Sequence, residues 1–275
     1  METVRITVKD IARQLHSWAP AHLAESYDNV GLLAGSYSDQ VSGVLVNLDM
    51  TEAVVEEAIR KNCNVIVAHH PIWFGGKKRL VEEDSYVSRI IIKAIRHRVN
   101  LFAIHTNLDN VRHGVNQKMA DTLGLIHTGI LLPRQADLPD VGSGMIGTLQ
   151  QPLSAEAFLE VVAKAFRCGG IRYAGPLHRP VQKVAICGGS GSFLIQAALD
   201  AQADAFVTGD ITYHKFFDQE DRMLLMDIGH YESEQFTSQL IEAYLSENFS
   251  TFAVHLSEVY TNPVRYYPDG RSGVS

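Results

Sequence analysis

The chain has 275 residues, 46% of them hydrophobic and 20% charged, with a formal net charge of −7. This balance is typical of a folded globular protein with room for two modest domains, and it excludes a disordered or fibrous chain. The net negative charge argues against nucleic acid as a partner, because phosphate binding needs clustered Lys and Arg. Three widely spaced cysteines and the lack of a long apolar run lead us to expect a cytoplasmic protein with no membrane contact.

The first clear pattern is a β-α-β unit. Residues 42–50 are typical of a buried strand, residues 51–62 have the apolar spacing of a helix packed on a sheet, and residues 63–71 indicate the next strand. Asp49, with Glu52 three residues later, predicts a capping box at the start of the helix. A right-handed crossover is expected for such a unit.

The next strand, residues 99–109, ends in His105 and Asp109, and residues 114–125 indicate a helix after it. An extra segment, residues 72–98, precedes this strand. Its "GGKK" is typical of a mobile turn and its tail of a helix.

The second half of the chain repeats this order. Residues 181–214 carry the same strand, helix and strand pattern, and the same number of residues separates Val44 from Val65 and Val184 from Ala205. Self-similarity of this kind indicates an internal duplication.

The strand after this unit ends in His230 and Glu234, which are four residues apart like His105 and Asp109. A helix pattern follows in both halves. We therefore predict an α/β fold of two related α/β lobes.

The lobe boundary is expected near residue 130. Residues 131–154 are rich in Pro, Gly and Ser and are interpreted as a connector. The first lobe would span residues 1–130 and the second 131–275, and the C-terminal strand could return to the first lobe.

Metal-binding side chains gather at predicted strand ends, where open α/β sheets bind ligands. They are His69, His70, His105, Asp109, His230 and Glu234. Imidazole and carboxylate groups are ligands of Zn, Mn, Fe, Co or Ni, and this number suffices for two divalent ions. The pattern predicts a dinuclear metal site at these strand ends, with a bend at Pro71 turning the two adjacent histidines to different ions.

Other readings of single residues stay open. A lone histidine at a strand end is usually only hydrogen-bonded, so the prediction rests on the convergence of several ligands. Asp210 and His214 lie at the same edge and are candidates for substrate binding or for a shell outside the metals, although Asp210 could equally cap the following segment. "CGGSGSF" lacks a phosphate-loop lysine and is interpreted as a tight turn.

Five motifs together resemble the Nif-three-like family, whose bacterial members are labelled GTP cyclohydrolase 1 type 2 homologs. They are "ESYDNVGLLAG", "AHHPIWF", "HTNLD", "ADAFVTGDITYH" and "DIGHYESE". The resemblance covers about residues 10 to 265. It implies a dinuclear metal centre in the cleft between the two α/β lobes and a ring-shaped homohexamer. The metal ligands that it implies are His69, His70, Asp109, His230 and Glu234, with Glu234 as the bridging carboxylate.

Two positions depart from the family pattern. Tyr27 stands where Trp is common and Met145 where Arg is common, and the second change would remove a contact to an anionic substrate.

The resemblance implies a metal-dependent hydrolase like GTP cyclohydrolase 1 type 2, acting with a metal-activated water on a small molecule such as a nucleotide. His105 is the candidate catalytic residue, as a proton-transfer group or a weak ligand. The same ligands would also suit a metal-binding regulator or metal carrier without turnover, and the ring would suit an interaction scaffold.

Overall fold

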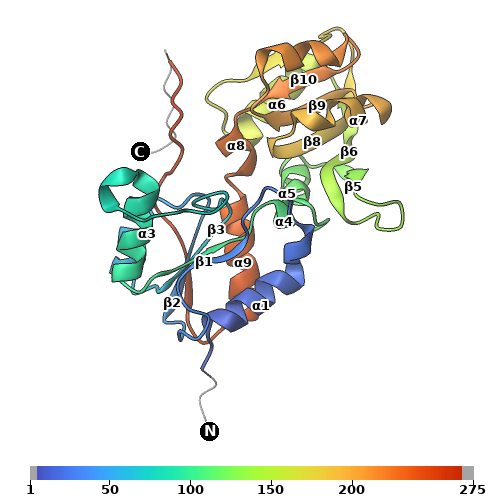
Figure 1. Cartoon of the computed structure of the whole chain (residues 1–275). Coiled ribbons are helices and arrows are strands. Elements are labelled where there is room, and N and C mark those ends of the chain that lie inside the picture. Colours follow the sequence, from blue (N-terminus) through green and yellow to red (C-terminus); the bar gives the residue numbers. More distant parts are fainter. Residues whose placement is uncertain (1–4, 268–275) are drawn as a thin grey trace. The chain divides into compact units, whose positions relative to one another are not determined.

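The computed structural model describes residues 5–267, which form two compact units (Figure 1). The first unit contains the described residues up to Leu108 together with Thr237–Thr261, and the second contains Asp109–Phe236 and the described residues from Asn262 onward. The chain thus passes to the second unit at residue 108, where the sequence suggested residue 130. Each unit has its own sheet and its own apolar core.

The sheet of the first unit has the strand order β1-β4-β3-β2-β11. Its strands are β1 (Gly31–Ala34), β2 (Gly43–Asn47), β3 (Val65–Ala68), β4 (Asn100–Ala103) and β11 (Ala253–Leu256). All neighbours are parallel except β1, which runs antiparallel to β4 at the edge. The strands β2, β3 and β4 are buried along their whole length, as expected for strands covered on both faces, whereas the edge strand β11 is partly exposed.

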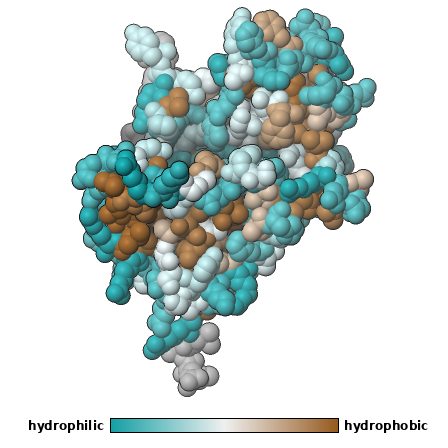
Figure 2. Space-filling view, viewed as in Figure 1, coloured by the Kyte–Doolittle hydropathy of each residue, from teal (hydrophilic) through white to brown (hydrophobic). Residues whose placement is uncertain are grey.

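The helices of the first unit are α1 (Val8–Trp18), α2 (Glu52–Arg60), α3 (Tyr86–Arg96) and α9 (Thr237–Asn248), and α4 (Thr106–Asp109) ends at the unit boundary. Short 3-10 turns lie at Ala21–Leu23 and Glu82–Asp84. Alternate residues of β2, β3 and β4, such as Leu45, Ile66 and Leu101, pack in one core with apolar residues of α2 and α3. Mixed apolar side chains remain exposed around α3, where Figure 2 shows a brown area.

The start of α2 differs from the predicted capping box. Thr51 is the N-cap residue, and its hydroxyl accepts a hydrogen bond from the Val54 amide at 3.3 Å. Asp49 lies two residues earlier, outside the helix, and its carboxylate has other partners. The capping role predicted for Asp49 was therefore wrong.

The sheet of the second unit has the strand order β5-β6-β8-β9-β10-β7. Its strands are β5 (Ile126–Pro133), β6 (Gly142–Leu153), β7 (Arg172–Ala174), β8 (Val181–Ser190), β9 (Ala205–Gly209) and β10 (Leu224–Asp227). The central strands β8, β9 and β10 are parallel, and β5, β6 and β7 add antiparallel pairs at the two sides.

The segment predicted to be a connector is instead part of this sheet. Residues 131–154 contain the end of β5 and all of β6, which form an antiparallel hairpin. Only Pro139 lies in the turn between the strands. The glycines of this segment are part of β6, where the buried positions are spaced for sheet packing.

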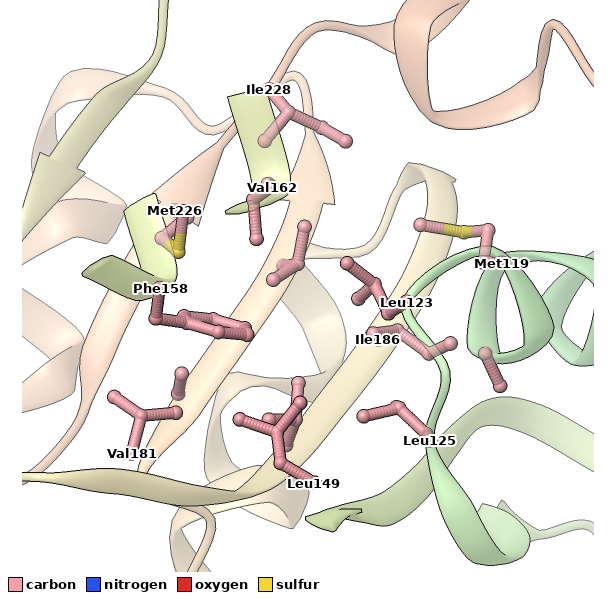
Figure 3. Close-up of a cluster of buried hydrophobic side chains, with 14 of the residues drawn as sticks. Met119, Leu123, Leu125, Leu149, Phe158, Val162, Val181, Ile186, Met226 and Ile228 are labelled. Atoms are coloured by element: carbon pink, nitrogen blue, oxygen red, sulfur yellow. The ribbon is translucent and has the colours of Figure 1, made fainter. Parts of the chain in front are cut away.

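The helices of the second unit are α5 (Val115–Thr122), α6 (Ala155–Ala165), α7 (Ile195–Asp200) and α8 (His230–Glu234), with 3-10 segments η3 (Ser192–Leu194) and η4 (Tyr213–Gln219). Both faces of the sheet are covered. On one face, Phe158 and Val162 of α6 pack against Ile186 and Met226 (Figure 3). On the other, Phe206 and Leu225 pack with apolar residues of α7.

The two central β-α-β units have matching strand registers. Val44 pairs with Val65 in the first unit and Val184 pairs with Ala205 in the second, at the positions that the sequence spacing aligned. In both units the parallel neighbours bring successive strand ends to one sheet edge. Within residues 5–267 the helices are all too short or too polar to cross a membrane.

One buried acid joins α2 to the segment after β11. The Glu57 side chain is 2% exposed, and its carboxylate accepts hydrogen bonds from the Glu258 amide at 3.0 Å and from the Ser257 hydroxyl. The Lys61 ammonium lies 2.8 Å away. Burial acts to raise the pKa of Glu57, but these donors outweigh it and the pKa is lowered.

We predict that Glu57→Ala lowers the free energy of unfolding by about 2 kcal/mol, because the Ser257 hydroxyl and the Glu258 amide lose their acceptor in hydrogen bonds that are partly buried. Urea denaturation of the variant measures this. The difference should be largest above the ordinary pKa of 4.5 and shrink as the pH falls through the lowered folded-state value. Glu56→Ala is the control, because the exposed Glu56–Lys93 pair should contribute only about 0.5 kcal/mol. Equal losses in both variants would contradict the prediction.

Candidate metal centre

Three histidines of the first unit lie together. His69 and His70 follow β3, and His105 follows β4, so the parallel pairing of these strands brings them to one edge. The chain bends at His69 and His70. One ring nitrogen of each histidine lies within 4.8 Å of those of the other two, a spacing that can hold a metal ion. We call these residues the histidine cluster.

The hydrogen bond of the buried His69 ring fixes its tautomer. Its Nδ1 lies 2.8 Å from the Ile104 carbonyl oxygen. A carbonyl only accepts, so Nδ1 must carry the hydrogen and donate it. In the neutral ring Nε2 then keeps its lone pair, which is the form that a metal ion requires.

The other two histidines use carboxylates for the same purpose. His70 Nδ1 donates to Asp49 Oδ1 at 2.7 Å, and His105 Nδ1 donates to Asp28 Oδ1 at 2.9 Å. Such carboxylate–histidine pairs orient the ring and raise the basicity of Nε2.

The two orienting carboxylates are themselves held in place. Asp49 accepts a hydrogen bond from the Thr261 hydroxyl at 2.6 Å. Asp28 accepts from the Thr106 amide at 3.1 Å and the Asn29 amide at 2.7 Å. Burial would raise the pKa of Asp28, but the His105 ring, the Thr106 hydroxyl and the Asn29 amide lower it to about 2, so Asp28 is ionised at neutral pH.

The second unit gathers Asp109, His230 and Glu234, which we call the acidic cluster. Asp109 ends α4, and α8 begins at His230 and ends at Glu234, which places these two side chains on one side of the helix. Oxygens of Asp109 and Glu234 lie within 4.8 Å of each other. His230 Nε2 lies 3.1 Å from Glu234 Oε2, and His230 Nδ1 lies 2.7 Å from Asp210 Oδ2.

Negative charge dominates the acidic cluster. Burial opposes the charged form of His230, yet Glu234 and Asp210 outweigh it and raise its pKa to about 11. Burial, together with Asp109 and Glu234, also raises the pKa of the nearby Cys187 thiol. The protonated His230 ring therefore supplies the positive charge between Asp210 and Glu234. A metal cation bound at Nε2 would supply that charge in place of the proton.

Close backbone packing holds α8 in position. The Gly189 backbone has φ of 61°, and a Cβ there would lie 2.5 Å from Glu234 Oε1, so only glycine fits. The Gly189 amide donates to Ser233 Oγ at 2.9 Å, which ties β8 to α8. Asn116 of α5 joins the Asp109 carbonyl to the Gly188 amide, with both hydrogen bonds at 3.0 Å. The glycine-rich stretch thus acts as a tight backbone contact.

The other two predicted site residues, Asp210 and His214, lie in different surroundings. Asp210 is the orienting acceptor of His230, in a left-handed conformation with φ of 54°. His214 lies in η4, is exposed, and its ring contacts Tyr213.

Sequence reasoning missed the roles of Asp28 and Asp49. Asp49 carried a usable signal, because it follows β2, whose register with β3 predicts its place beside His70. Asp28 lies in an irregular segment before β1, and no periodicity indicates its contact with His105.

The donors of both clusters are imidazole nitrogens and carboxylate oxygens. This set fits a divalent transition metal of intermediate hardness and contains no thiolate. Cys63 and Cys187 are buried free cysteines that belong to neither cluster.

Residues 6–263 match the family described as Duf34/NIF3 (NGG1p interacting factor 3). A relative from Clostridium acetobutylicum, named GTP cyclohydrolase 1 type 2 homolog, is 33% identical over 230 residues, covering 83% of this chain and 85% of the relative. The crystal structure of a Staphylococcus aureus hypothetical protein is 30% identical with a TM-score of 0.88, covering 95% of this chain and 99% of that one. A Bacillus cereus protein related to NIF3 is 25% identical with a TM-score of 0.88, and the match covers 96% and 100% of the two chains.

We predict that Asp49→Asn lowers the affinity for Zn²⁺ by about 10–100-fold, because an amide orients His70 less firmly and polarises it less. Isothermal titration of the metal-free protein measures the affinity. Asp200→Asn removes an exposed carboxylate on α7 and should leave it unchanged. Unchanged affinity in Asp49→Asn would mean that His70 Nε2 binds no metal.

Proposed function

Because the chain belongs to the Duf34/NIF3 family, we propose that it is a dinuclear metal-dependent hydrolase with chemistry like that of GTP cyclohydrolase 1 type 2. The observation that carries this proposal is shared by four histidines of the two clusters, each of which has its Nδ1 held by an oxygen. Nε2 of His69 and His70 is thereby prepared to bind a cation, and Nε2 of His105 to bind a cation or accept a proton. His230 can bind a cation through Nε2 once that nitrogen has released its proton to solvent.

The two clusters would hold the metal ions together. In this proposal His69 and His70 come from one lobe of a duplicated α/β fold, and Asp109, His230 and Glu234 come from the other, with the site in the cleft between the lobes. The matching strand registers of the two units support the duplication. The ions would be two divalent cations from among Zn, Mn, Fe, Co and Ni, and Glu234 would be shared by both.

A pair of such ions, when bound, lowers the pKa of water towards about 7 and supplies a nucleophile at neutral pH. The residues of the chain then control the proton. His105 Nε2 accepts the proton, while its Nδ1–H remains hydrogen-bonded to the Asp28 carboxylate. Because the pKa of Asp28 is about 2, this carboxylate stays ionised and stabilises the imidazolium that forms.

Two exposed aromatic rings, one beside His105 and one next to it in turn, would suit a planar substrate such as a nucleotide. The Phe74 ring lies 5.9 Å from the His105 ring, and the Tyr27 ring lies 6.5 Å from Phe74. Aromatic faces of this kind stack on bases irrespective of sequence. Lys77, Lys78 and Arg79 follow in the chain and would offer positive charge to phosphates.

The decisive residue for turnover is Glu234. We expect Glu234→Gln to reduce metal-dependent turnover by about 10²–10⁴-fold, because an amide cannot be shared between two cations as a carboxylate is. The protein is loaded with Mn, Zn, Fe, Co or Ni and screened against nucleotides, phosphodiesters and cyclic amides. Glu247→Gln, an exposed change on α9, is the control. Elemental analysis of protein purified without added metal identifies the native ion.

The alternative functions give different results in the same screen. Tight metal binding with no turnover of any class would favour a metal-binding regulator or metal carrier. A scaffold would keep its partner binding when the ligands are removed.

The protein would act as a ring-shaped homohexamer. Exposed apolar residues around α3, including Leu80, Val81 and Ile95, offer surface for contacts between copies. Sedimentation velocity should give the mass of six chains. A monomer at every concentration tested would contradict the ring.

A further inference from the structure

A cavity of about 610 Å³ lies at one side of the second unit's sheet. It is lined by the edge strand β7 with the following Gly175, and by η4 with the two residues after it. None of its lining residues belongs to the histidine cluster or the acidic cluster. The volume is typical of a small-molecule site, for which the range is about 300–1,000 Å³.

Aromatic rings form much of the cavity wall. Tyr173, Tyr213 and Phe217 line it and are 47%, 71% and 64% exposed, and Phe216 lines it as well. The Tyr213 and Phe217 rings meet edge to face at 5.6 Å. Large aromatic side chains left exposed together around a hollow mark a binding surface rather than ordinary surface residues.

Arg172 adds a flat cationic group to the same wall. Its guanidinium donates to the Ile211 carbonyl at 2.8 Å and to the buried Asp227 carboxylate, and lies 5.4 Å above the centre of the Phe216 ring. These contacts fix the guanidinium plane. A planar ring system can stack on such a plane as it does on an aromatic face.

The lining residue Gln219 carries a buried polar atom. The Gln219 side chain is only 7% exposed, and its Oε1 has no hydrogen-bond donor within residues 5–267. Gly175 packs closely here, since a Cβ would lie 3.2 Å from this oxygen and 2.2 Å from the Met223 carbonyl oxygen. A buried acceptor of this kind is costly unless a donor reaches it, so a ligand with an N–H group would complete it.

The rim of the cavity contains two residues with strained backbone. Glu220 and Asp221 are consecutive non-glycine residues in the left-handed region, with φ of 53° and 52°. Strained backbone of this kind concentrates at ligand sites.

The charge of the rim disfavours phosphate. Arg172 pairs with Asp227 and Arg222 pairs with Glu220, so the Asp221 carboxylate leaves the rim with excess negative charge.

We propose that this cavity is a binding site for an uncharged planar heteroaromatic compound with N–H groups, the chemistry of a free purine base or nucleoside. The rings and the guanidinium stack on the plane, and Gln219 accepts a hydrogen bond from the ligand edge. The site is independent of the metal centre and of the proposed hydrolase function.

The first test is binding of adenosine and guanosine to the full chain, measured by titration calorimetry and ligand-observed NMR. Phe217→Ala should weaken binding roughly tenfold or more, because one stacking face is lost. Phe193→Ala is the matched control, since Phe193 lies in η3 of the same unit, is 63% exposed and does not line the cavity. Adenine should bind through the same wall, and ATP more weakly than adenosine.

The second test examines the hydrogen bond rather than the fold. Purine riboside lacks the exocyclic amino group of adenosine, so the protein should prefer adenosine by roughly tenfold. Gln219→Met should abolish this preference while stacking persists. If Gln219→Met does not fold, Phe217→Ala still decides the proposal, because Phe217 is exposed.

Two backgrounds separate this site from the metal centre. Phe217→Ala should weaken nucleoside binding by the same factor in the unchanged metal-free protein and in the Glu234→Gln and Phe74→Ala backgrounds, whatever those two changes do to turnover. The proposal is overturned if no purine compound binds at about 1 mM, or if Phe217→Ala and Phe193→Ala have equal effects. It is also overturned if Phe217→Ala changes only the sedimentation of the protein, which would make the wall a contact between copies.

Discussion

The hydrogen bond at histidine Nδ1 is the constraint on which the candidate centre depends. An imidazole binds a metal well only if one nitrogen is free of hydrogen and points in a fixed direction. The fold meets this requirement by giving Nδ1 an acceptor that cannot donate, the Ile104 carbonyl for His69 and the Asp28 carboxylate for His105. Because each acceptor comes from a neighbouring part of the same unit, the orientation is set by the packing of the unit before any ion binds.

The two clusters reach this state with different electrostatics. In the histidine cluster the negative charge lies on the carboxylates that accept from Nδ1 of His70 and His105. Hydrogen-bond donors around Asp28 outweigh the effect of burial on its pKa. In the acidic cluster Glu234 is buried, and a proton on His230 supplies the balancing positive charge. Metal binding by the acidic cluster is therefore also a proton-release reaction, and it weakens as the pH falls.

Much of this could be predicted from the sequence, because it follows from periodic patterns. Runs of apolar residues predicted the parallel strands. Val44 and Val65 are as far apart in the sequence as Val184 and Ala205, and each pair lies side by side in the observed strand registers. The hairpin of β5 and β6 was missed, since the Gly and Pro residues that suggested a connector lie mostly within β6 itself. Asp28 was missed because its contact with His105 is a tertiary one, between an irregular segment and a strand end.

The cavity of the second unit illustrates a second limit of sequence reasoning. No sequence pattern singles out Tyr213 and Phe217, and only the fold shows that both remain exposed around a hollow. Gln219 is likewise an ordinary polar residue until its burial is known. A buried acceptor and exposed rings reverse the usual placement of polar and apolar groups, and this reversal is stable only if a partner covers both. The same argument applies to the carboxylates of the acidic cluster, where the partner expected is a cation rather than a planar ring.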